Sequence, residues 1–156
     1  MADRVFNHEE LVTTVVQNGL DRIDALQINH DHKSHPKTFL FALALGAAEK
    51  KRIPNNAAKK LAWVQYSAFN NADTEILSMI KSVALSELRK EKKDNLITDE
   101  DLTYEIAAEY VNTGLTKIKE MIPDFDEYDD FDFALQLIEM MDEKIAEISA
   151  NEDVSD

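Results

Sequence analysis

The sequence predicts an all-α protein: a single-domain bundle of five to six helices, spanning residues 1–150. Three Gly and three Pro in 156 residues leave little turn chemistry for a many-stranded sheet. Apolar residues make up 44% of the chain, which is enough to build a hydrophobic core. Apolar side chains also recur at helical spacing along most of the chain. We expect residues 151–156 to form an acidic, frayed tail.

The predicted bundle is organised around one helix, at about residues 36–52. Ten successive residues inside it, 39–48, carry no charge and no hydrogen-bonding side chain. A helix that is apolar on all sides is expected to be buried on all sides. Ten residues are too few to cross a bilayer, which needs ~20 apolar residues. Pro36 suits the first turn of this helix, where a missing N–H has no consequence. Arg52 suits the C-terminal end, where a cation complements the helix dipole.

One further helix is predicted before this central helix, and one directly after it. Asn7 is a suitable cap for the first, with Glu10 as its reciprocal partner, and the apolar period continues to about residue 26. Asn18-Gly19 either interrupts this helix or allows a close crossing with a neighbour, and both interpretations remain open. Another helix is expected over residues 57–69.

The second half of the chain predicts three more helices. One spans residues 73–93 and closes in a basic cluster. The next begins with Thr98 as cap, followed by acidic residues that complement the helix dipole, and Pro123 ends it. The last covers about residues 130–149. Its apolar period predicts seven inward side chains, which are Phe133, Ala134, Leu137, Ile138, Met141, Ile145 and Ile148.

Charge is divided unevenly along the chain, whose formal net charge is −14. Residues 1–93 hold 14 Lys and Arg against 11 Asp and Glu, whereas residues 94–156 hold 3 against 20. An acidic surface repels nucleic acid and attracts basic protein surfaces, so direct DNA binding is not expected. An acidic exterior that only keeps the protein soluble is an equally good interpretation.

An acidic and aromatic run precedes the last predicted helix and is the main candidate for binding a protein partner. A standard calcium loop is excluded, because counting from Asp124 puts Asp129 where Gly is required and Leu135 where a bidentate Glu is required. Carboxylates interleaved with aromatic rings suit docking on a basic groove or mimicry of a phosphate backbone, although the rings equally suit a loop pinned to the core. The candidate residues are Asp124, Asp126, Glu127, Tyr128, Asp129 and Asp130.

Three histidines in one polar connection are weak candidates for metal ligands. His30, His32 and His35 can ligate a divalent cation together with Asp31. The chain offers no cysteine and no later histidine to complete such a site from a second element. A solvated loop is therefore the preferred interpretation, and no metal or cofactor is expected.

Carboxylates at i, i+4 and i+8 on the fifth predicted helix resemble those of di-iron bundles. These residues are Asp101, Glu105 and Glu109. Di-iron bundles also require Glu-x-x-His pairs, and no histidine follows position 35. We therefore expect a solvent-facing acidic stripe.

A basic patch is predicted around the turn that follows the central helix. Clusters of this kind can bind phosphates. In so acidic a chain we instead expect them to pair with its own carboxylates or with an acidic partner. The residues are Lys50, Lys51, Arg52, Lys59 and Lys60.

The sequence motifs of common enzyme classes are missing. There is no Gly-rich phosphate-binding loop, no Gly-x-Ser-x-Gly and no His-Glu-x-x-His. Gly19, Gly46 and Gly114 fall inside predicted helices, where we expect them to allow close packing. The prediction is a protein that is not an enzyme. The first residues do not form a signal peptide, which predicts a cytoplasmic location.

The segment Phe39-x-Phe41-Ala42-x-Ala44-Leu45-Gly46 resembles one found in small accessory proteins of bacterial DNA phosphorothioation (Dnd) systems. In those proteins a basic stretch and a proline follow, as Lys50-Lys51-Arg52-Ile53-Pro54 does here. A late helix of that family is similar to residues 106–115. The resemblance covers about half the chain. It implies a cytoplasmic partner protein in DNA modification or restriction, and it carries over no catalytic residue.

Three hypotheses of function follow, in this order: the charge division supports the first two, the resemblance adds to the first, and the histidine loop supports the third. The first is a non-enzymatic accessory protein of a DNA-modification or restriction system of the phosphorothioation type, which docks on a basic protein partner through its acidic surface. The second is an acidic DNA mimic, such as an anti-restriction protein. The third is a metal-binding protein that uses the loop from His30 to His35.

Overall fold

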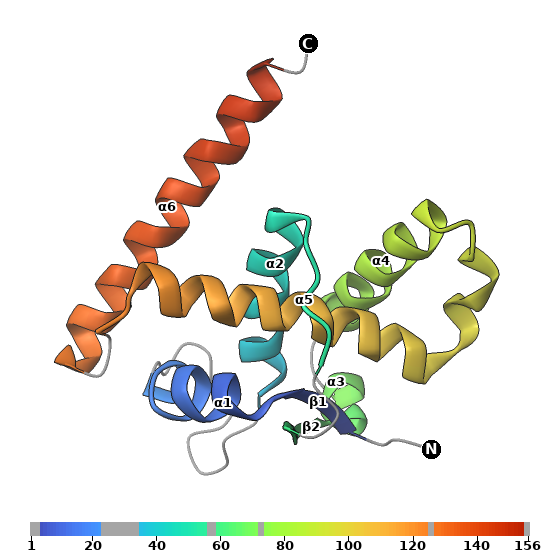
Figure 1. Cartoon of the computed structure of the whole chain (residues 1–156), viewed down its shortest axis with the longest axis horizontal. Helices are drawn as coiled ribbons and strands as arrows, with labels where there is room; N and C mark the ends of the chain where they lie inside the picture. The colour runs from blue at the N-terminus through green and yellow to red at the C-terminus, as the bar shows by residue number, and fades with distance from the viewer. Residues whose placement is uncertain (1–3, 23–34, 56–58, 72–73, 125–126, 155–156) are drawn as a thin grey trace.

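The chain folds mainly into helices and adds one small sheet (Figure 1). The computed structural model describes residues 4–22, 35–55, 59–71, 74–124 and 127–154. The prediction of a mostly helical bundle is confirmed. In chain order the elements are β1 (Arg4–His8), α1 (Glu9–Leu11), the π-helix η1 (Val12–Gln17), the 3-10 helix η2 (Leu20–Arg22), α2 (Pro36–Glu49), β2 (Lys60–Gln65), α3 (Tyr66–Asn71), α4 (Thr74–Lys90), the 3-10 helix η4 (Asp94–Thr98), α5 (Glu100–Met121) and α6 (Asp130–Val154).

Helices α2 and α5 cross at the centre of the molecule, where their backbones touch (Figure 1). A methyl group on Gly46 would lie 1.8 Å from the carbonyl oxygen of Tyr110, and one on Gly114 would lie 1.9 Å from that of Ala42. Only glycine leaves room for so close an approach. The prediction that Gly46 and Gly114 allow close packing is confirmed. Gly19 instead lies in a turn between η1 and η2, which interrupts the first predicted helix.

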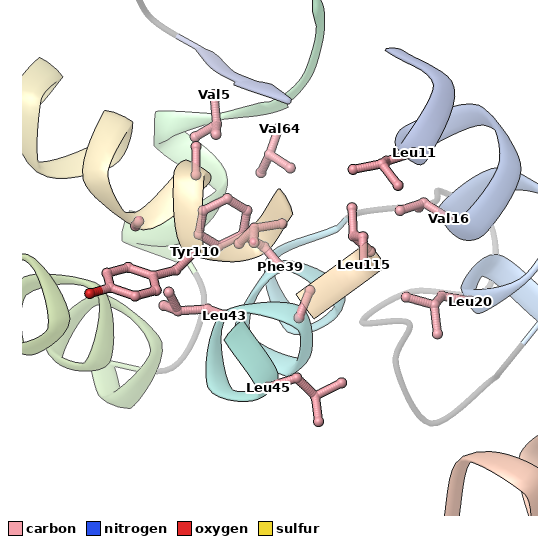
Figure 2. Packing of buried hydrophobic residues seen from close by; sticks show 14 of the residues in the cluster. Val5, Leu11, Val16, Leu20, Phe39, Leu43, Leu45, Val64, Tyr110 and Leu115 are labelled. Carbon is pink, nitrogen blue, oxygen red and sulfur yellow. The ribbon is translucent and has the colours of Figure 1, made fainter. Parts of the chain in front are cut away.

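Most of the circumference of α2 is buried around this crossing. Phe39 and Leu43 are fully buried, and the Phe39 ring packs edge-on against Phe69 with 5.0 Å between the ring centroids. Figure 2 shows Phe39 and Leu43 among side chains from the strands, the first helical segment and α5. Burial on all sides is nevertheless wrong for Ala44, which is exposed. The reason is that α6 covers this side of α2 only in part, leaving a groove there.

Strands β1 and β2 form an antiparallel pair that the sequence analysis did not predict. Val5 pairs with Val64 and Phe6 with Ala62, so Trp63 is the extra residue of a bulge. The helix predicted to start at Asn7 is therefore wrong over β1, and the helix predicted over residues 57–69 is wrong over β2. The two strands are far apart in sequence, and each is too short for its periodicity to reveal the pairing.

A buried hydrogen-bond network joins this sheet to α5. The Asn7 amide donates to the carbonyl of Ala108 and to the side-chain oxygen of Asn112, both at 2.8 Å. The Trp63 indole donates to the side-chain oxygen of Asn7 at 2.7 Å, and Asn112 donates to that of Asn55 at 2.7 Å. Asn7 and Asn112 are fully buried. A buried amide that lacks its partners costs about 1–3 kcal/mol, so this network holds β1 against α5.

The ends of α2 and α5 are set by residues at or next to the helix termini. Pro36 occupies the first turn of α2, as predicted, and the helix ends at Glu49 because Lys50 takes a left-handed conformation with φ of 58°. The cap of α5 is Asp99 and not Thr98, since the Asp99 carboxylate accepts a hydrogen bond from the N–H of Leu102 at 3.1 Å.

Candidate protein-binding surface

The acidic run before α6 lies on the surface. Asp129 also caps α6, because its carboxylate accepts a hydrogen bond from the N–H of Asp132 at 2.8 Å. Asp126 lies outside the described residues. The remaining candidate residues are all exposed, so a partner can reach them; they are Asp124, Glu127, Tyr128, Asp129 and Asp130.

Arg22 clamps this run to the body of the molecule. Its Nε donates to the carboxylate of Asp130 at 2.7 Å, and its guanidinium also donates to the carbonyl of Tyr128. The same guanidinium lies over the ring of Phe133, 5.3 Å from the centroid. These contacts fix the point at which α6 leaves the body.

One stripe of α6 faces the rest of the protein. Phe133, Leu137 and Met140 are buried, and the Lys144 side chain is nearly so. The prediction of inward side chains is confirmed for Phe133 and Leu137. Beyond the predicted tail boundary, α6 continues to Val154.

A second apolar stripe of α6 is exposed. The prediction that Ile138, Met141 and Ile145 point inward is wrong. The apolar residues of α6 occupy an arc wider than one line of contact can cover, and the body takes only the side of Phe133 and Leu137. The exposed stripe consists of Phe131, Leu135, Ile138, Met141 and Ile145.

Lys144 anchors α6 to the C-terminal end of α2. Its ammonium group donates to the carboxylate of Glu49, from which the ammonium of Lys117 lies 3.7 Å. The hydrogen bond from Lys144 and the charge of Lys117 hold the pKa of Glu49 below its usual value. The same hydrogen bond raises the pKa of Lys144. Since Lys144 is the one Lys or Arg in the sequence of α6, the rest of the charge on this helix is negative.

The residues of the predicted basic patch belong to two different places. Lys50, Lys51 and Arg52 follow α2, whereas Lys59 and Lys60 lie at the start of β2, and Figure 1 shows these two points far apart. The Lys60 ammonium lies over the ring of Phe6, 4.7 Å from the centroid.

Arg52 is paired with carboxylates of the same chain. Its guanidinium lies 3.1–3.6 Å from three of them, which makes it unsuited to a phosphate. The expectation that basic residues pair with the chain's own carboxylates is confirmed for Arg52. The three carboxylates belong to Glu87, Glu91 and Glu109.

The carboxylates along α5 line a cavity of about 390 Å³ between this helix and the strands. The prediction of a solvent-facing stripe is confirmed for Glu105, which is exposed, whereas Asp101 and Glu109 are only half-exposed. The hydroxyl of Tyr66 donates to Asp101 at 3.1 Å, and burial together with this bond raises the pKa of Tyr66. Burial also raises the pKa of Glu109. Arg4 and Lys60 line the same cavity, so it does not select a ligand of one sign.

The histidines do not form a recognisable metal site in the part of the chain that the structure describes. The ring Nε2 of His35 lies 2.9 Å from the carboxylate of Asp21, and its ring centroid lies 5.3 Å from that of Trp63. His30 and His32 lie outside the described residues. Among the described residues, no group of three or more His, Asp or Glu is arranged to hold a metal ion.

A family model for DNA sulphur modification system-associated protein 4 matches residues 23–156. The chain belongs to this family. The resemblance to accessory proteins of Dnd systems is thereby confirmed. Comparisons with curated proteins and with solved structures give no match. Within the described ranges, every helix is too short or too polar to span a membrane.

In this member of the DNA sulphur modification-associated family, the matched region includes α2, α5 and α6. Neither the role of Arg22 nor the exposed stripe of α6 was predicted from the sequence. No local signal points to Arg22, because its partner Asp130 is 108 positions away. The stripe did leave a signal, since Phe131, Leu135 and Ile138 repeat at helical spacing beside the buried stripe.

Proposed function

We propose that this protein is a non-enzymatic accessory protein of a DNA sulphur modification system, acting in the cytoplasm, and that it binds a basic surface of another protein of that system. Membership of the family carries the proposal. The binding surface is the acidic run before α6 together with α6 itself.

The distribution of charge supports this surface. Arg22 and Lys144 are bonded to Asp130 and Glu49 within the chain. Many other carboxylates are exposed and available to a basic partner, which they attract and orient before contact. On α6 the exposed ones include Asp132, Glu139, Asp142, Glu143 and Glu147.

A non-catalytic role is supported by what the polar groups already do. Asn7, Trp63 and Asn112 bond to one another inside the protein and hold the sheet to α5. Arg52 is bonded to glutamates, and carboxylates and cations of comparable number share the cavity beside α5. The sequence carries none of the hydrolase or phosphate-binding motifs.

Co-purification from the native host tests the proposal. Tagged protein is expected to retain another component of the sulphur modification system, and retention is expected to weaken as salt rises, because salt screens exposed charges. A variant with Asp124→Asn, Glu127→Gln and Glu139→Gln is expected to lose most of this retention.

A matched control removes the same charge elsewhere. Asp94→Asn, Glu100→Gln and Glu105→Gln also neutralise three exposed carboxylates, on η4 and α5, and are expected to keep the retention. Equal loss in both variants would mean that bulk charge and not this surface matters. Partners unrelated to DNA modification would overturn the proposal.

The exposed carboxylates along α6 also favour a second candidate, an acidic DNA mimic. Such a protein would compete with DNA for a nuclease, most strongly at low salt. The exposed apolar side chains of Phe131, Ile138 and Ile145 have no counterpart on a phosphate backbone, which places this candidate second. Absence of competition at low salt would remove it.

A further inference from the structure

We propose that the exposed stripe of α6, together with the groove that it forms with α2, is a docking site for a basic amphipathic helix of a partner protein. The inference rests on the proposed function and specifies the kind of partner and the side chains that meet it.

The stripe is a continuous apolar surface on one side of a helix. Phe131 is 71% exposed, Ile138 54% and Ile145 59%, and Leu135 and Met141 lie between them. Successive members are three or four positions apart, so they lie on the same side of α6. Five of the eight exposed large apolar side chains among the described residues belong to this stripe. Apolar side chains gathered in this way mark interaction sites.

The stripe continues into a groove of about 160 Å³ between α6 and α2. Met141 and Ile145 form its α6 side. The ammonium of Lys144 is turned to Glu49, so its hydrocarbon stem is the part left to line the groove. The α2 side consists of Phe41, Ala44, Leu45 and Ala48.

The dimensions suit a helix as the occupant. From Phe131 to Ile145 the stripe is ~21 Å long at 1.5 Å per residue, about four turns. A helix of comparable length can lay one apolar face along it and insert a side chain between α6 and α2. Figure 1 shows the C-terminal end of α6 standing clear of the other helices, and the stripe residues are exposed.

The charges that flank the stripe decide which helix fits. Asp132, Glu139 and Asp142 are exposed on α6, and Lys144 is already bonded to Glu49. A partner with Lys or Arg beside its apolar face therefore pairs with carboxylates along the whole length of the stripe. A second copy of this chain would bring two rows of carboxylates together, and like-charge repulsion opposes that arrangement.

Site-directed crosslinking in the native host tests the proposal on the full chain. A photo-crosslinking amino acid replaces Ile138, and in a control strain it replaces Leu96, which is 37% exposed on η4. Position 138 is expected to crosslink to a partner segment with apolar residues at three- and four-residue spacing and Lys or Arg beside them. A crosslink to the protein's own chain, to an acidic or non-periodic segment, or only to what position 96 captures would overturn the proposal.

The mapped segment is then synthesised as a peptide, and its affinity is measured with the full-length protein. The double variant Ile138→Ser and Ile145→Ser is expected to bind it at least tenfold more weakly, whereas Leu96→Ser is expected to leave the affinity unchanged within twofold. The peptide is expected to gain helix content on binding, measured by circular dichroism. Equal affinity for wild type and double variant would overturn the proposal.

The two proposals can fail separately. If the double variant weakens the peptide but the captured protein has no role in DNA modification, the docking site stands and the proposed function fails. If the double variant still retains a component of the modification system as well as wild type does, the proposed function stands and this docking site fails.

Discussion

Helices α2 and α6 are both rich in apolar residues, yet they meet opposite surroundings. In α2, Phe39 and Leu43 are fully buried, and Gly46 brings the helix into backbone contact with α5. In α6, Phe133 is buried while Ile138 on another side of the same helix is more than half exposed. Apolar content alone therefore does not separate a core helix from one that leaves an apolar stripe exposed.

The difference between the two helices lies in their neighbours. Helix α2 has α5 on its glycine side and aromatic rings such as Phe69 on another. Helix α6 packs through one stripe that includes Phe133, and Arg22 near its start and Lys144 near its middle add polar contacts. An amphipathic period shows that a stripe needs a partner, and tertiary structure decides whether that partner belongs to the same chain.

Introducing a charged side chain is expected to give the largest difference in stability between changes in α2 and changes in α6. Leu43→Asp places an unpaired carboxylate in the core and is expected to lower the free energy of unfolding by more than about 4 kcal/mol, abolishing a cooperative transition. Ile138→Asp is expected to change it by no more than ~0.5 kcal/mol. Thermal melts followed by circular dichroism measure both, and an unchanged melt for Leu43→Asp would refute the burial of α2.

A methyl group at the crossing of α2 and α5 is expected to destabilise the protein, although helix propensity alone would favour it. Propensity alone favours Ala over Gly by ~1 kcal/mol. In Gly114→Ala the new methyl group meets the Ala42 carbonyl, so the free energy of unfolding is expected to fall by about 1–3 kcal/mol. Ala44→Gly, on the exposed side of α2, should lose only the ~1 kcal/mol of propensity. Urea denaturation decides, and a stabilised Gly114→Ala would contradict the backbone contact.

Loss of the buried amide network should have an intermediate effect. Asn112→Ala removes one hydrogen-bond partner from each of Asn7 and Asn55 and is expected to lower the free energy of unfolding by about 1–3 kcal/mol. Asn95→Ala, at an exposed position of η4, is the matched control and should stay within ~0.5 kcal/mol of wild type. Similar stability of both variants in urea would mean that the network does not hold the sheet to α5.

Two glutamates are expected to make small contributions to stability that change with pH in opposite directions. The pKa of Glu49 is lowered by Lys144, so Glu49 contributes stability above its usual pKa that is lost as pH falls through the lowered value. The pKa of Glu109 is raised by burial, so its ionisation reduces stability as pH rises from its usual pKa through the raised value.

Urea denaturation between pH 3 and pH 7 measures this pair, in steps of roughly half a unit. Relative to wild type, Glu49→Gln is expected to become less stable as pH rises, and Glu109→Gln more stable. The same sign of change in both variants would contradict one of the two assignments.

The parts of the fold that local pattern predicted are the long helices. Pro36 and the uncharged run after it predict α2, and the regular period after residue 98 predicts α5. The sheet was missed because Val5 and Val64 pair across 59 positions and a buried Asn7 interrupts the alternation of apolar residues. In the candidate site, exposure of Asp124 and Glu127 agrees with the prediction of an accessible acidic run, whereas the clamp by Arg22 depends on a distant contact.

By itself, the sequence determined that the chain is mainly helical, that negative charge gathers in its second half, and that it resembles Dnd accessory proteins, because propensity, charge and motif are properties of neighbouring residues. Tertiary structure alone decided that Asn7 lies in a strand, that Arg52 is paired with three glutamates, and that one apolar stripe of α6 remains exposed. These outcomes depend on which segments pack against one another, because the burial of a side chain is set by its neighbours in space.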